Sequence, residues 1–175
     1  MVTANGFPKS GNHALVKALR LLGEPCAVNH LPYVSNVQGK HILIKRDPRN
    51  VVVSALRHMG RVVTQSAVRT EIAEFGLTSP GSLVEQMAAY EGWLSDPNTY
   101  VVRYEDLIAD DVAMRGIAAY IGVEYVAGTF EKLPGHTETW NIVRSDYSLL
   151  WTEETQAAWE AAGGPDLLNR WGYGN

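Results

Sequence analysis

The sequence is poor in thiols, in excess charge and in long apolar runs. Cys26 is its single cysteine, which excludes an internal disulfide and a cysteine-based zinc site. The net charge of −4 gives no general attraction for nucleic acid, so an anion site must come from local basic residues. No apolar run reaches 18 residues and no basic-then-apolar leader begins the chain, so we expect no membrane span and a cytoplasmic protein.

Length and composition fit one globular domain. The 175 residues include 46% hydrophobic and 19% charged side chains, which are ordinary values for a globular protein. A chain of this length can bury a core without disulfides or metals. We therefore expect a single domain over residues 1–175, of an oligomeric state that the sequence does not indicate.

Strand and helix patterns alternate along the chain. Apolar runs predict strands at 1–4, 26–29, 41–45 and 99–102, the last two as inner strands. Helical periodicity predicts helices at 14–22, 48–59, 82–94, 111–121 and 153–162. Residues 60–81 suggest an irregular helix or a flap, and residues 122–151 show no clear pattern. The alternation predicts an α/β fold, in which helices flank a parallel sheet.

A glycine-bounded loop, Gly6-Phe7-Pro8-Lys9-Ser10-Gly11, separates the first strand from the first helix. Its glycines let the backbone approach an oxyanion, and the N–H groups of the helix start attract negative charge. The spacing is that of a P-loop, but Asn12 and His13 replace the Lys-Ser/Thr pair that binds ATP and Mg²⁺. The loop therefore favours an anionic donor used without metal. A strand-to-helix turn that binds nothing is the alternative.

Four polar residues each follow one of the predicted strands. They are Lys9, His30, Arg46 and Tyr104. In open parallel sheets, ligands bind beyond the carboxyl ends of the strands. We expect these four residues to meet at that edge.

Four segments, in this order, resemble sulfotransferases that use 3′-phosphoadenosine 5′-phosphosulfate (PAPS), and the cytosolic branch in a shortened form. Residues 7–13 resemble the loop for the 5′-phosphosulfate, and His30-Leu31-Pro32 resembles the segment of the catalytic histidine. Residues 46–54, which place Arg46 and Ser54 eight apart, resemble the motif for the 3′-phosphate. Residues 104–107, Tyr-Glu-Asp-Leu, are similar to the segment near adenosine. The resemblance covers residues 5 to about 122.

The resemblance implies an enzyme that moves a sulfuryl group in line from PAPS to a hydroxyl of a small molecule or glycan, without metal, and releases PAP. His30 would be the base, because an imidazole accepts protons near neutral pH. Lys9 would stabilise charge on the leaving phosphate oxygen. The cofactor contacts that the resemblance implies are Pro8, Lys9, Ser10, Gly11, Asn12, His13, Arg46, Ser54, Tyr104 and Arg144.

The sequence departs from the family in several places. The family's C-terminal Arg-Lys-Gly loop over the 3′-phosphate has no clear copy, and Arg144 is the best candidate for its role. The interval from the glycine loop to the histidine is shorter than in typical cytosolic members. The Thr-Thr-Trp that usually follows the second glycine is Asn12-His13-Ala14, and the lysine often found two residues before the histidine is Val28. Charge stabilisation then depends more heavily on Lys9. A P-loop nucleotide kinase, a non-catalytic PAPS or PAP binding module and a protein-interaction scaffold are the alternatives. Magnesium-dependent ATP turnover, the effect of His30→Ala and the affinity for PAP separate them.

Overall fold

The computed structural model describes residues 2–36, 38–78, 80–133 and 146–174. Backbone contacts divide the chain into two compact units. The first comprises Met1–Arg46 and Gly92–Val143, and the second Asp47–Glu91 and Arg144–Asn175. The expected single domain over residues 1–175 stays a prediction.

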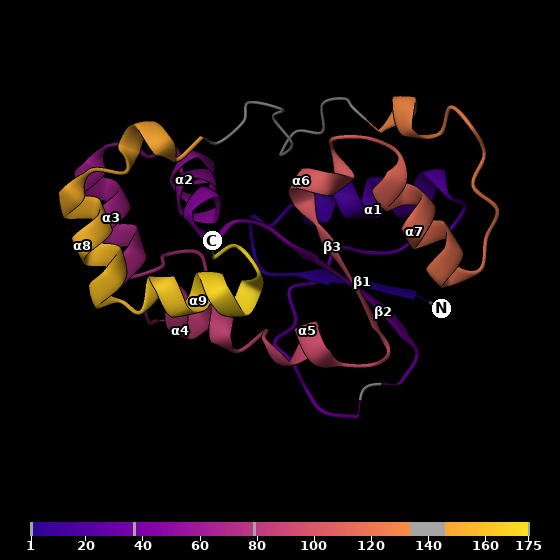
Figure 1. The fold of residues 1–175 in the computed structure, drawn as a ribbon, viewed down its shortest axis with the longest axis horizontal. Helices are drawn as coiled ribbons and strands as arrows, with labels where there is room; N and C mark the ends of the chain where they lie inside the picture. The colour runs from indigo at the N-terminus through magenta and orange to yellow at the C-terminus, as the bar shows by residue number, and fades with distance from the viewer. Residues whose placement is uncertain (1, 37, 79, 134–145, 175) are drawn as a thin grey trace. The chain divides into compact units, whose positions relative to one another are not determined.

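The first unit contains a parallel sheet with the strand order β1-β2-β3. Its strands are β1 (Val2–Gly6), β2 (Lys40–Lys45) and β3 (Thr99–Arg103). Its helices are α1 (Asn12–Leu21), α5 (Gly92–Ser95), α6 (Tyr104–Leu107) and α7 (Val112–Ile121), with a 3-10 turn at Phe130–Lys132. Figure 1 shows α1, α6 and α7 on one side of the strands and α5 on the other.

The core of the first unit lies between the sheet and the helices α1 and α7. Ile42 and Ile44 of β2 are fully buried in a cluster with residues of both helices, such as Leu15 and Ile117. His41, of opposite parity in the same strand, contacts Trp93 of α5 at 4.9 Å between ring centroids. Successive side chains of a strand point to opposite faces, so β2 is covered on both.

The strands predicted from residue 1 onward and at 41–45 and 99–102 are confirmed, but the one at 26–29 is wrong. There the chain makes an isolated parallel bridge, between Asn5 and Asn29. The ladder ends because the Asn5 side chain, not its backbone, bonds the next part of this segment, at Leu31. β3 was expected inside the sheet, yet among the described strands it neighbours β2 alone. Accordingly, Thr99, Tyr100 and Val101 are only half-buried and Arg103 is exposed, whereas Val102 is buried.

The second unit is helical in its described part. It contains α2 (Pro48–His58), α3 (Gln65–Ala73), α4 (Leu83–Ala88), α8 (Glu153–Ala161) and α9 (Gly164–Trp171), with a 3-10 turn at Ser148–Leu150. The predicted helices at 48–59 and 153–162 are confirmed, as is that at 111–121 in the first unit. The Asp47 side chain accepts a hydrogen bond from the Arg49 amide, and Pro48 takes the first helical position, which fixes the start of α2.

Three predictions for residues between 60 and 164 need correction. Residues 60–81 contain a regular helix, α3, whose start is capped by the Thr64 hydroxyl. The single helix predicted at 82–94 is two helices, α4 and α5, separated at residues 89–91. Gly163 and Gly164 end α8 as predicted, but Gly164 also begins α9, with Pro165 in its first turn.

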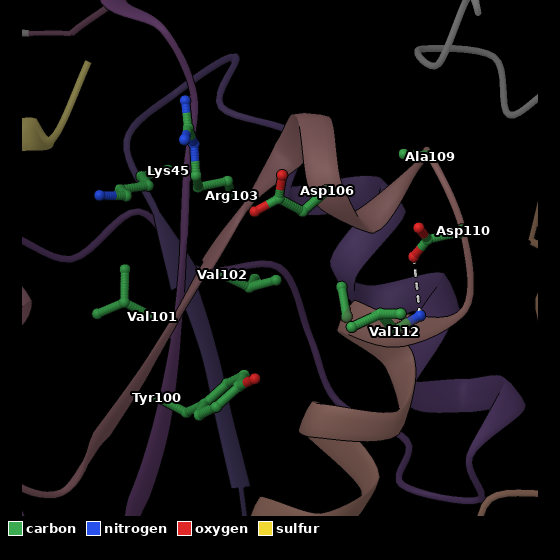
Figure 2. A pocket seen from close by; sticks show the side chains of 10 residues that line it. Lys45, Tyr100, Val101, Val102, Arg103, Asp106, Ala109, Asp110 and Val112 are labelled. Atoms are coloured by element: carbon green, nitrogen blue, oxygen red, sulfur yellow. Dashed lines mark hydrogen bonds between the residues drawn. The ribbon is translucent and has the colours of Figure 1, made fainter. Parts of the chain in front are cut away.

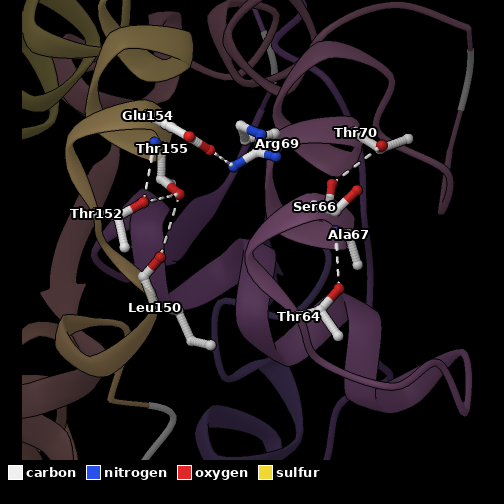
Figure 3. A network of polar contacts seen from close by, with 9 residues as sticks. All are labelled: Thr64, Ser66, Ala67, Arg69, Thr70, Leu150, Thr152, Glu154 and Thr155. Carbon is white, nitrogen blue, oxygen red and sulfur yellow. Dashed lines mark hydrogen bonds and ion pairs between the residues drawn. The ribbon is translucent and has the colours of Figure 1, made fainter.

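An ion pair joins α3 to α8, and further hydrogen bonds fix the start of α8 (Figure 3). Arg69 Nη1 lies 2.7 Å from Glu154 Oε2, and the buried Thr155 hydroxyl donates to the Leu150 carbonyl at 3.2 Å. The Thr152 hydroxyl accepts from the Thr155 amide and caps α8. Within the described ranges, no helix is both long enough and apolar enough to cross a membrane.

Candidate active site

The loop between β1 and α1 depends on its two glycines. A Cβ on Gly6 would lie 2.8 Å from the Ile44 carbonyl oxygen of β2. Gly11 has φ 104°, and a Cβ there would come within 2.3 Å of the Tyr104 ring. Glycine at both positions therefore allows the loop to lie against β2 and against Tyr104. The GxxxxG spacing reflects two close approaches within the first unit.

The loop stands where the strand order reverses. With the Asn29 bridge, segments from four parts of the chain lie in the order 26–29, β1, β2, β3. The chain leaves β1 and then returns on both of its sides, which makes the carboxyl end of β1 a topological switch point. Open parallel sheets bind their ligands at such a point.

Both the backbone conformation of Lys9 and the surroundings of its charged side chain are unfavourable. Its φ of 69° is left-handed, which costs a non-glycine residue about 1 kcal/mol or more. Burial, and then the charge of Arg46, lower the pKa of its ammonium group from the usual 10.5. No carboxylate from the described part of the chain forms an ion pair with it. Backbone strain and a crowded cation at one loop residue fit an anion-binding role.

Arg46 and Tyr104 connect the ends of β2 and β3 to the loop. The Arg46 guanidinium lies 4.5 Å from the centroid of the Tyr104 ring, and Arg46 Nη1 donates to the Lys9 carbonyl at 3.3 Å. Both side chains are largely buried. The cation over the ring is a favourable arrangement that also fixes the guanidinium. The predicted meeting of Lys9, Arg46 and Tyr104 is therefore observed.

His30 lies beside the same loop. Its Nδ1 is 2.9 Å from the Gly6 carbonyl oxygen. Asn12 Nδ2 lies farther from the same nitrogen, at 3.4 Å, and already donates to the Gly6 and Phe7 carbonyls. Because a carbonyl accepts hydrogen bonds and does not donate them, the shorter contact to Gly6 requires the proton at Nδ1. The neutral ring then has its lone pair at Nε2, the atom that a general base requires. The residue is exposed, so a substrate can reach it.

Two buried oxygen atoms in the loop have no hydrogen-bond partner among the described residues. They are Ser10 Oγ and Asn12 Oδ1. Buried polar atoms are normally paired, so a serine hydroxyl in this position fits a site that receives phosphate oxygens. Asn12 differs, because its Nδ2 donates to the Gly6 and Phe7 carbonyls at 3.3 and 3.0 Å. Its amide nitrogen supports the loop.

Comparison with known proteins identifies the family. The family described as "Sulfotransferase domain" matches residues 22–147. The chain belongs to the sulfotransferase family. In this sulfotransferase chain the matched range begins after the glycine loop. A search of curated proteins finds no match.

A solved structure shares the fold. The crystal structure of mouse sulfotransferase SULT7A1 complexed with PAP matches with a TM-score of 0.70 and 16% sequence identity. The match covers 97% of this chain and 82% of the mouse chain. At this identity the likeness shows the fold, and the predicted α/β architecture with a helix-flanked parallel sheet is confirmed.

The other predicted site residues of the sulfotransferase chain do not all lie in the same part of the fold. Pro8 is buried within the loop, and His13 is exposed in the first turn of α1. Ser54 lies on α2 in the second unit and is partly exposed. Arg144 lies outside the described residues. The first unit thus brings together residues 8–13, His30, Arg46 and Tyr104.

Sequence reasoning missed Asn5, which contacts the segment that carries His30. Asn5 is 1% exposed, and its side chain makes two hydrogen bonds to the Leu31 backbone. The sequence feature that could have indicated Asn5 is the position of an amide side chain within a predicted strand, next to the buried Ala4. An unpaired amide is costly in such a place, so its presence indicates partners.

A pocket of about 590 Å³ lies beside β3 in the first unit and is lined by residues of β3 and of the segment after it (Figure 2). Its lining includes Lys45, Tyr100, Val102, Arg103, Asp106 and Asp110. Burial, and then the charge of Arg103, lower the pKa of Lys45. None of the predicted site residues lines this pocket. In the described ranges, no three His, Cys, Asp or Glu residues form a cluster able to hold a metal ion.

Proposed function

We propose that this sulfotransferase chain transfers a sulfuryl group from PAPS to a hydroxyl acceptor. One observation carries the proposal: the His30 imidazole, its Nδ1 on the Gly6 carbonyl, stands beside a glycine loop whose Lys9 is paired with no described carboxylate. A base, an anion cradle and a cation are the parts that this transfer needs. The PAP in the related mouse sulfotransferase supports the choice of donor.

We propose residues for each of the two phosphate ends of PAPS. The loop from Pro8 to His13 would hold the 5′ end, where the buried Ser10 hydroxyl lacks a described partner. Arg46 and Ser54 would hold the 3′-phosphate, since a planar guanidinium and a hydroxyl suit phosphate oxygens. Tyr104 would lie near adenosine and support Arg46. Arg144 would close over the 3′-phosphate.

His30 and Lys9 divide the chemistry. When bound, PAPS supplies the sulfuryl group and its leaving phosphate. His30 Nε2 takes the proton of the acceptor hydroxyl, so that the oxygen gains nucleophilic character as its O–H bond breaks. The Lys9 ammonium stabilises the negative charge that develops on the leaving oxygen. We propose that these two groups act without a metal ion.

The proposal also covers the acceptor, the domain organisation and the cellular location. The acceptor would be a small molecule or a glycan that bears a hydroxyl group. We propose that the chain works as a single domain in the cytoplasm.

A transfer assay tests this function. Purified chain is incubated with sulfur-labelled PAPS and a panel of phenols, polyols and glycans, and in parallel with ATP and Mg²⁺. We expect label on one acceptor class, and a loss of turnover of about 10²–10⁴-fold in His30→Ala. Magnesium-dependent phosphoryl transfer would overturn the proposal in favour of a kinase. PAP binding with no label on any acceptor would identify a binding module.

A further inference from the structure

The buried amide of Asn5 acts as a clamp on the segment after His30. Asn5 Nδ2 donates to the Leu31 carbonyl at 2.8 Å, and the Leu31 amide donates to Asn5 Oδ1 at 2.9 Å. One side chain thus satisfies both backbone groups of one residue, as a neighbouring strand would. Asn5 is 1% exposed, so water does not compete for these bonds.

The described residues add two further polar contacts between this segment and β1 beside those of Asn5 with Leu31 and of His30 with Gly6. The backbone bridge is limited to Asn5 and Asn29, and the Asn29 side chain adds a bond of 3.2 Å to the Ala4 carbonyl. Pro32 follows Leu31 and has no N–H to donate. Trp93 Nε1 donates to the same Leu31 carbonyl at 3.0 Å. Asn5 is the described residue that bonds Leu31 through both backbone groups.

Consecutive residues of β1 hold consecutive residues of the segment. Asn5 bonds the Leu31 backbone, and the next residue, Gly6, accepts the hydrogen bond from His30 Nδ1. The His30–Gly6 contact therefore exists only while the backbone beside His30 stays in register with β1. We propose that Asn5 is the positioning residue that fixes the ring orientation and tautomer of His30, an inference that rests on the proposed function of His30 as base.

The tautomer decides whether His30 is able to act. With the proton held at Nδ1 by Gly6, the neutral ring presents a lone pair at Nε2. A ring released from Gly6 is able to accept at Nδ1 from the Asn12 amide, 3.4 Å away, which favours the tautomer protonated at Nε2. That form accepts no proton at Nε2. Loss of the clamp is expected to lower the rate of transfer while PAP binding, which uses other residues, stays intact.

The test combines nitrogen NMR of the histidine rings with kinetics on the full chain. The five histidines are few enough to resolve, and His30→Gln assigns the His30 signal. At a pH where the ring is neutral, the wild-type chain is expected to show His30 protonated at Nδ1. Asn5→Leu, which matches the shape of the amide without its hydrogen bonds, is expected to show both tautomers. Its kcat is expected to fall about 10- to 100-fold, as for other residues that orient a functional histidine, with PAP affinity changed less than about twofold.

Two further variants keep the proposal falsifiable. Asn5→Ser replaces Asn5→Leu if the latter does not fold, because it also lacks the reach to Leu31. Ile117→Val, a buried change in α7 of the same unit, is the matched control for general destabilisation. It should lower the melting temperature and leave the His30 tautomer unchanged.

The outcomes distinguish the positioning role of Asn5 from the proposed sulfuryl transfer. A folded Asn5 variant that keeps the wild-type tautomer and kcat overturns the proposal. A tautomer change in a chain that never transfers sulfuryl groups supports the positioning role and refutes the proposed function. A tautomer change in Ile117→Val as well would show that Asn5 acts through stability alone and also overturns the proposal.

Discussion

Lys9 lowers the stability of the folded chain in two ways. A left-handed backbone is unfavourable for a side chain with a Cβ, and a half-buried ammonium beside Arg46 is unfavourable for its charge. Such costs are common at functional sites, where a ligand repays them. Substitutions of Lys9 can therefore change the free energy of unfolding and PAP binding in different directions.

We predict that Lys9→Gly is more stable than Lys9→Ala by about 1 kcal/mol. Both variants lose the ammonium group and its repulsion with Arg46, but glycine alone adopts the φ of 69° without strain. Urea unfolding of the two variants measures the difference. Both should bind PAP weakly. Equal stability of the two would show that the left-handed backbone at this position carries no cost.

The lowered pKa of Lys9 predicts a pH dependence of PAP binding. An anion beside Lys9 raises its pKa again, so the bound chain retains a proton that the ligand-free chain loses first as pH rises. PAP affinity should therefore fall as pH rises through the pKa of ligand-free Lys9, which lies below the usual 10.5. Calorimetry at several pH values measures this slope. The slope should be absent in Lys9→Met.

The same shift has a consequence for folding. Below the lowered pKa, Lys9 is protonated in both the folded and unfolded states, and the folded state bears the full cost. As pH rises from that pKa towards 10.5, the folded state loses its proton first, so the free energy of unfolding rises relative to Lys9→Met. A fall in this window would contradict the assigned burial.

At the scale of elements, the glycine loop and α6 depend on each other. Gly11 lies where a Cβ would meet the Tyr104 ring, and Tyr104 is the first residue of α6. The ring in turn lies against the Arg46 guanidinium. A change at Gly11 should therefore reach Arg46 through Tyr104.

We predict that Gly11→Ala destabilises the chain by about 1–3 kcal/mol more than Gly23→Ala. Both glycines have positive φ, of 104° and 84°, so both variants carry backbone strain. No atom of the described residues lies within 4 Å of a Cβ at Gly23, whereas a Cβ at Gly11 would lie 2.3 Å from the Tyr104 ring. Unfolding curves and PAP titrations test the pair. Gly23→Ala should bind PAP as the wild type does, and a similar result for Gly11→Ala would contradict the packing of the loop on Tyr104.

Elements with local signals were predictable. Asp47 and Pro48 indicated the start of α2, and Thr152 that of α8, because capping depends on neighbours in sequence. The cap of α3 at Thr64 was equally visible and was missed. The segment 26–29 was not predictable as a single bridge, since a side chain from β1 replaces the backbone ladder there.

At the scale of the whole chain, the parallel-sheet rule predicted most of the observed cluster. Lys9, Arg46 and Tyr104 each follow a strand, and the carboxyl ends of parallel strands share one edge. The division into two units was not predicted, because it depends on contacts between segments distant in sequence. Asn5 was missed for the same reason: its partner, Leu31, lies 26 residues away.

The central claim is that one nucleotide with phosphates at two ends binds without metal. Calorimetry of PAP, adenosine 5′-monophosphate and ATP with Mg²⁺ against the wild-type chain tests it most directly. We predict micromolar or tighter binding of PAP in the absence of Mg²⁺, and binding of the monophosphate at least about tenfold weaker, since each tenfold step is 1.4 kcal/mol and a phosphate held by a guanidinium contributes at least that. Equal affinity for PAP and the monophosphate, or binding of ATP with Mg²⁺ in place of PAP, would contradict the account.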